Sequence, residues 1–93
     1  MDEFTVRGPV ERFPGENGWF YVKLSARQSA QLGPLVRSEW PALLKIRCTL
    51  GDTTWKATIM PIKDGPLFVA LPAKVRKAEA IVVGQRVTLR CLL

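Results

Sequence analysis

The chain has 93 residues, of which 24% are charged and 47% hydrophobic, and its formal net charge is +6 at pH 7. This length allows one small domain, and the composition is that of a soluble globular protein. No apolar run approaches the roughly 20 residues of a membrane helix, and the acidic start Met1-Asp2-Glu3 is unlike a signal peptide. We therefore expect a single domain over residues 1–93 in the cytoplasm.

Alternation of apolar and polar residues predicts six strands, because side chains two residues apart share one face of a strand. Gly8-Pro9 interrupts the first of them, and the missing amide hydrogen of proline indicates an edge, a bend or a bulge there. Residue pairs that favour tight turns follow three strands: Asn17-Gly18, Gly51-Asp52 and Asp64-Gly65. The expected strands cover residues 3–12, 19–24, 43–50, 53–62, 67–71 and 86–92.

A first short helix is expected after the second strand. Ser25 and Gln28 have the spacing of a capping box, in which each side chain satisfies a backbone amide of the other residue. They predict a helix over residues 25–32 that ends before Gly33. The connection over residues 34–41 has no assigned form. Its larger apolar side chains are expected to plug the core: Leu35, Val36 and Trp40.

A second short helix is expected from Pro72, whose missing amide hydrogen is not needed in the first turn of a helix. It should run to about residue 80 and stop before Gly84. Lys74 and Lys77 would share its outer face by their spacing. The side chains expected to face the sheet are Val75, Ala78 and, beyond the helix, Val82.

The two halves of the chain resemble each other. Residues 21–27 align with 68–74, and residues 44–50 align with 87–93, so the inward apolar positions coincide. Each half would be a strand–strand–helix–strand unit, and two interleaved units can close a barrel that has no free edge. We therefore predict a mainly β fold, a small closed six-stranded barrel of two pseudo-equivalent ββαβ units with two short helices, of the cradle-loop type.

Cys48 and Cys91 occupy equivalent positions in this alignment, and each continues an apolar row. We expect both to be buried, free thiols. The chain contains no CxxC pair and no histidine, so we expect no metal site and no cofactor. Paired carboxylates and a cysteine beside a base are also missing, and we therefore expect no enzymatic activity.

Four stretches of the chain together carry a family resemblance. They are Gly18-Trp19-Phe20-Tyr21-Val22; Trp55-x-Ala57-Thr58 ending near Pro61; Asp64-Gly65 before residues 67–71; and Val75-Arg76-Lys77-Ala78 before Val83-Gly84-Gln85-x-Val87. The sequence resembles the bacterial and archaeal domain-of-unknown-function family 1905, whose members stand alone or are fused to a YdeI/OmpD-associated domain. The resemblance implies a small β-barrel, supplies no established activity and assigns no catalytic residue.

Two details qualify this resemblance. The chain has Gly84-Gln85 where the family usually has Gly-Asp, so a turn carboxylate is replaced by an amide. The pattern over residues 71–84 also resembles the swapped-hairpin barrels of AbrB-type transcription factors. Those proteins bind DNA as dimers through basic residues, which would imply a basic nucleic-acid surface here.

Two functions are open from the sequence. The first is a non-enzymatic binding or regulatory module for nucleic acid or another acidic partner such as an acidic protein, with no membrane and no metal involved. Its basic residues would be Lys45, Arg47, Lys74, Arg76, Lys77, Arg86 and Arg90. The alternative is that these basic residues are only solvated and bind no partner, and that Arg76 forms a structural ion pair with Glu79.

The second function is a small-molecule or peptide-binding barrel with a pocket at the barrel mouth. The residues expected to line this pocket are Trp19, Trp55 and Phe68. Aromatic side chains of this kind also pack cores and barrel rims, so the sequence leaves this alternative open.

Overall fold

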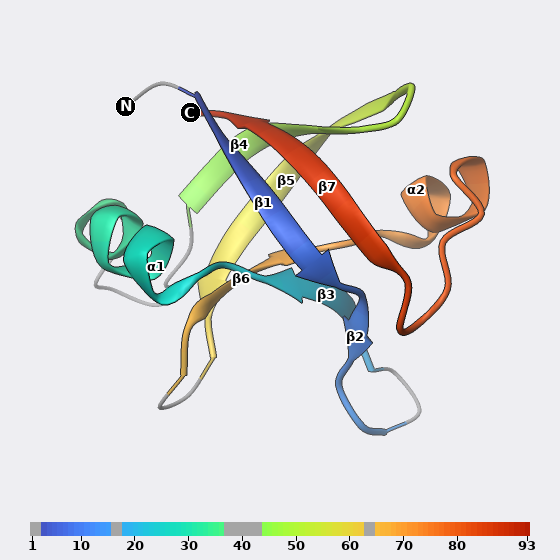
Figure 1. Ribbon diagram of the computed structural model, residues 1–93, viewed down its shortest axis with the longest axis horizontal. Helices are drawn as coiled ribbons and strands as arrows, with labels where there is room; N and C mark the ends of the chain where they lie inside the picture. The colour runs from blue at the N-terminus through green and yellow to red at the C-terminus, as the bar shows by residue number, and fades with distance from the viewer. Residues whose placement is uncertain (1–2, 16–17, 37–43, 63–64) are drawn as a thin grey trace.

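The computed structural model describes residues 3–15, 18–36, 44–62 and 65–93, and it shows a nearly closed, barrel-like antiparallel sheet (Figure 1). Its strands are β1 (Glu3–Pro9), β2 (Glu11–Arg12), β3 (Phe20–Lys23), β4 (Leu44–Leu50), β5 (Thr53–Pro61), β6 (Leu67–Ala70) and β7 (Arg86–Leu92). The order across the sheet is β1-β7-β4-β5-β6-β3-β2. Two short helices, α1 (Ala26–Leu32) and α2 (Ala73–Ala78), and a 3-10 turn, η1 (Gly33–Leu35), complete the described chain. None of the helices in these residues is long and apolar enough to span a membrane.

The sheet has seven strands because the first expected strand is divided at its Gly8-Pro9 interruption. β1 pairs with β7, whereas β2 pairs with β3. Between them, the Val10 amide donates to the Gln85 carbonyl and the Val10 carbonyl accepts from the Gly84 amide, both at 2.8 Å. The chain therefore bends from one ladder to the other, and this bend brings the two ends of the sheet together.

The strand registers follow the internal alignment. In the β4–β7 ladder Cys48 lies directly opposite Cys91, and in the β3–β6 ladder Val22 lies directly opposite Val69. These are residues that the alignment equates. The first strand of each half also places an aromatic residue opposite a cysteine of the other half. Most ladders thus join one half of the chain to the other.

The inward rows fill the barrel with apolar side chains. The largest fully buried ones are Ile59, Leu89, Val6, Val10, Val22, Val69, Val75, Cys48 and Cys91. Both cysteines are buried and free, as predicted, and their sulfur atoms lie 3.2 Å apart. The hydrogen bond to Cys91, together with burial, raises the pKa of the Cys48 thiol, so Cys48 is neutral at physiological pH.

The capping box of α1 is confirmed. The Ser25 hydroxyl accepts from the Gln28 amide at 3.1 Å, and the Gln28 side chain accepts from the Ser25 amide at 3.3 Å. Beyond α1, Leu35 does not plug the core, because its side chain is 51% exposed on η1. Val36 packs against the core as expected. Trp40, the start of the strand expected at Leu43 and the turn residue Asp64 lie outside the described residues.

Helix α2 ends earlier than expected, in a Schellman motif. The Ile81 amide donates to the Arg76 carbonyl at 2.9 Å and the Ala80 amide donates to the Lys77 carbonyl at 3.5 Å. Ala80 has a φ of +53°, so it occupies the left-handed position that glycine usually takes. As a result Ile81 is buried. Val75 faces the sheet as expected, but Ala78 and Val82, which were expected to face it too, are exposed, Val82 by 63%.

The turn before β7 explains how the chain tolerates Gly84-Gln85. Gly84 has a φ of +90°, a conformation that glycine adopts without strain. The Gln85 side-chain oxygen accepts from the Val82 amide at 3.2 Å. An amide oxygen thus occupies an acceptor position in this turn, at the place where the resemblance implied a carboxylate.

Candidate binding groove

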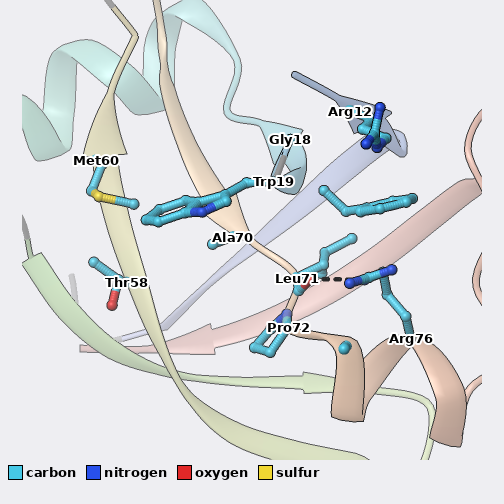
Figure 2. Close-up of a pocket in the computed structure, with 11 residues that line it drawn as sticks. Arg12, Gly18, Trp19, Thr58, Met60, Ala70, Leu71, Pro72 and Arg76 are labelled. Carbon is cyan, nitrogen blue, oxygen red and sulfur yellow. Dashed lines mark hydrogen bonds between the residues drawn. The ribbon is translucent and has the colours of Figure 1, made fainter. Parts of the chain in front are cut away.

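A groove of about 670 Å³ lies on the outside of the sheet, beside the start of α2. Its walls come from β5, from the segment joining β6 to α2 and from the chain that leads into β3. Figure 2 shows Trp19 and Met60 on one side of it and the guanidinium groups of Arg12 and Arg76 on the other. The volume is within the range of about 300–1,000 Å³ that is typical of small-molecule sites.

Arg76 is held in a defined orientation at one end of this groove. Its Nε donates to the Leu71 carbonyl at 3.1 Å, and its guanidinium carbon lies 3.8 Å from the centroid of the Phe20 ring. The ion pair considered with Glu79 is not formed, because the Glu79 carboxylate accepts from the Thr53 hydroxyl at 2.6 Å instead. Both Nη groups of Arg76 therefore remain without a partner among the residues that the structure describes.

Arg12 brings a second guanidinium to the same end. It lies 5.8 Å from the Phe20 ring centroid and donates to the Gly15 carbonyl at 2.8 Å. Two guanidinium groups therefore lie near one aromatic ring at this end of the groove. Arg12 is engaged with the polypeptide chain, so the hydrogen-bond donors offered here are the Nη groups of Arg76.

Trp19 forms the other end. It precedes β3 and stands outside the inward row of the barrel, which leaves its side chain 54% exposed. Met60 and Ala70 continue the apolar wall beside it. An exposed indole next to a thioether offers a flat apolar surface on which a planar ring can stack.

The structure brings only Trp19 of the three expected pocket residues to this groove. Trp55 points inward from β5 and packs against the core. Phe68 is buried in an aromatic cluster, with ring centroids 5.3 Å from both Phe13 and Tyr21. Sequence reasoning missed Met60 and Arg12, since neither has a local signal that would place it beside Trp19.

The expected basic residues divide between separate surfaces. Arg76 lines the groove, whereas Lys74 and Lys77 are exposed elsewhere on α2. The others are exposed on the outer face of β4 and β7: Lys45, Arg47, Arg86 and Arg90. Lys56 of β5 joins this outer face directly opposite Arg47, and its alternation with inward Trp55 and Ala57 was the signal that could have identified it.

The polar side chains of the groove are few. Its described lining holds two guanidinium groups and the Thr58 hydroxyl, with no carboxylate or thiol. Across the described ranges, no three residues of the types that ligate metals gather at one place. The functional groups that remain are donors for an anion and an apolar surface for a ring.

The model of the family described as Domain of unknown function (DUF1905) matches residues 7–91, which confirms the resemblance seen in the sequence. Neither the curated proteins nor the solved structures include a significant match.

Proposed function

The chain belongs to the DUF1905 family, and we propose that it is a non-enzymatic binding module whose groove holds an acidic ligand that carries a flat ring. The observation that supports this proposal is the fixed guanidinium of Arg76 at one end of the groove, with the exposed indole of Trp19 at the other. A ligand with a phosphate or carboxylate at one end and a ring at the other matches both ends.

The chemistry of Arg76 favours such a ligand. A planar guanidinium binds carboxylate or phosphate oxygens through parallel hydrogen bonds. The Leu71 carbonyl and the Phe20 ring already fix its orientation, so little side-chain freedom is lost when an anion binds. Trp19 then contributes stacking, which needs only a planar face and tolerates different rings.

A titration that follows tryptophan fluorescence tests the proposal, with a nucleoside monophosphate and an aromatic carboxylate as acidic probes and the parent nucleoside as the neutral probe. Arg76→Gln should weaken binding of the acidic probes by about 10- to 100-fold, since hydrogen bonds to charged groups contribute about 1.5–3 kcal/mol. Trp19→Ala should weaken every probe that has a ring, measured for this variant by calorimetry. Arg27→Gln, which removes an equal charge from α1, is the control.

Two outcomes would contradict the proposal. One is equal affinity for the nucleoside and its monophosphate, which would mean that the groove does not recognise the anion. In the other, Arg76→Gln leaves the affinity for the acidic probes unchanged and Arg27→Gln alters it. That result would place the anion elsewhere on the protein.

We also infer the finer architecture. If β1 and β2 count as one bent strand, the barrel consists of two ββαβ units. We assign this barrel to the cradle-loop type because a short helix lies at each of its two ends. The registers support this interpretation, since Cys48 faces Cys91 and Val22 faces Val69. The two free thiols also favour a reducing, cytoplasmic location.

A further inference from the structure

We propose that the ligand of this groove is one nucleotide of a single-stranded nucleic acid, whose backbone continues from the groove across the outer face of β4 and β5. This inference rests on the proposed function and adds the class of ligand. It requires a second surface, which we call the basic track and define as Lys45, Arg47 and Lys56.

The groove and the basic track are continuous. The groove reaches Thr58 of β5, and Lys45 of β4 lies directly opposite Thr58. Lys45 also borders a second hollow of about 440 Å³, which Arg47 and Lys56 line as well. Because residues two apart share one face of a strand, Lys56, Thr58 and Met60 form a single outward row that runs from the track into the groove.

The charges of the track are not compensated within the described part of the chain. Arg47 and Lys56 are direct cross-strand partners, and like charges in such positions destabilise a sheet. The ion pair found in the described residues joins Lys23 to Glu11, away from the track. All three cations of the track are exposed. A like-charged pair that lowers the stability of the sheet, and that no acidic side chain of the described fold neutralises, is typical of a binding surface. The ligand that would neutralise these cations is a polyanion.

The spacing of the cations suits a flexible chain of phosphates. Neighbouring strands lie about 4.8 Å apart, and residues two apart on one strand are separated by about 7 Å. Arg47 and Lys56 are therefore one strand apart, and Lys45 is one step further along β4 toward Thr58. A backbone that follows this row passes from one cation to the next and reaches Arg76 through the groove.

The groove selects an unpaired base. Stacking on Trp19 needs a free base face, which the interior of a duplex does not offer. None of the residues that define the track is aromatic, so its contacts would be with phosphates and would carry no sequence information. We therefore expect binding with little sequence preference and a clear preference for single strands.

The test uses fluorescence anisotropy with labelled ten-nucleotide oligothymidine and oligouridine, and with a duplex of equal length. The single strands should bind more tightly than both the duplex and a nucleoside monophosphate. The logarithm of the affinity should fall with the logarithm of salt concentration with a slope of about −3, since four contacts contribute about −0.7 each for single strands. The four contacts are Arg76, Lys45, Arg47 and Lys56.

The double variant Arg47→Gln/Lys56→Gln should make this slope shallower by about 1.4 and should leave the affinity for the nucleoside monophosphate unchanged. The matched control is Arg7→Gln/Arg27→Gln, which removes the same charge from a separate hollow beside α1. Circular dichroism and thermal melting of both double variants establish that each remains folded.

The outcomes separate the two proposals. If the monophosphate binds through Arg76 but the oligonucleotides bind no more tightly, or if both double variants change the slope equally, the nucleic-acid inference is overturned and the proposed function stands. If oligonucleotides bind through the track but are insensitive to Trp19→Ala and Arg76→Gln, the groove proposal is overturned and the single-strand inference with it. Equal affinity for duplex and single strand also overturns the inference.

Discussion

Replacing Ala80 with glycine should stabilise the protein. Ala80 has a φ of +53° in the Schellman motif that ends α2, and its methyl group is exposed, so little packing is lost on its removal. The left-handed conformation costs a residue other than glycine about 1–2 kcal/mol. The greater freedom of glycine in the unfolded chain offsets about 0.4–1 kcal/mol of that gain. The expected net increase in the free energy of unfolding is therefore about 0.5–1 kcal/mol.

A thermal melt followed by circular dichroism measures this change. For a domain of this size 1 kcal/mol corresponds to about 4–8 °C, so Ala80→Gly should raise the melting temperature by about 2–8 °C. Ala78→Gly is the matched control, because the same substitution at the last residue of α2 removes a helix-favouring residue and should lower the melting temperature. If Ala80→Gly melts at or below the parent temperature while Ala78→Gly behaves as expected, the reasoning about backbone strain is refuted.

Three further predictions concern the sheet. Lys56→Glu should raise the free energy of unfolding by about 0.2–1 kcal/mol, because opposite charges would then face each other at the Arg47 pair; a lower denaturation midpoint would contradict this. Cys48 and Cys91 should react with a thiol reagent only as fast as the barrel opens, so rapid labelling of the native protein would count against their burial. Deletion of residues 86–93 should abolish folding, because β7 pairs on both sides; a truncated monomer that unfolds cooperatively would show that β7 is dispensable.

Much of the fold is local and could be read from the sequence. Alternation placed the strands, and the spacing of Ser25 and Gln28 placed the start of α1, because both signals depend on neighbouring residues alone. Gly8-Pro9 marked the place of the bend, although the sequence could not show that the bend transfers the chain from β7 to β3. The end of α2 was missed because alanine occupies a position that glycine usually signals.

The site was less predictable because it depends on tertiary contacts. Arg76 was identified as a basic residue, but the Phe20 ring that helps to fix its orientation comes from a distant part of the chain, and the Leu71 carbonyl comes from the segment just before α2. Trp19 and Trp55 both looked like pocket residues from the sequence. Only the structure shows that one stands outside the barrel and the other packs into it.

The pairing of β1 with β7 has a consequence for how the chain can be reconnected. Glu3 lies opposite Leu92, so the start of β1 and the end of β7 are neighbours in the sheet (Figure 1). A short linker between them would form a hairpin like the one that joins β4 to β5 at Gly51-Asp52. If β1 and β2 are counted as one bent strand, a circular permutant opened at Gly51-Asp52 has the same succession of strands and helices as the parent chain. The β1–β7 ladder then becomes local and the β4–β5 ladder becomes distant. The contact order therefore changes little, and the permutant should refold at a rate close to that of the parent.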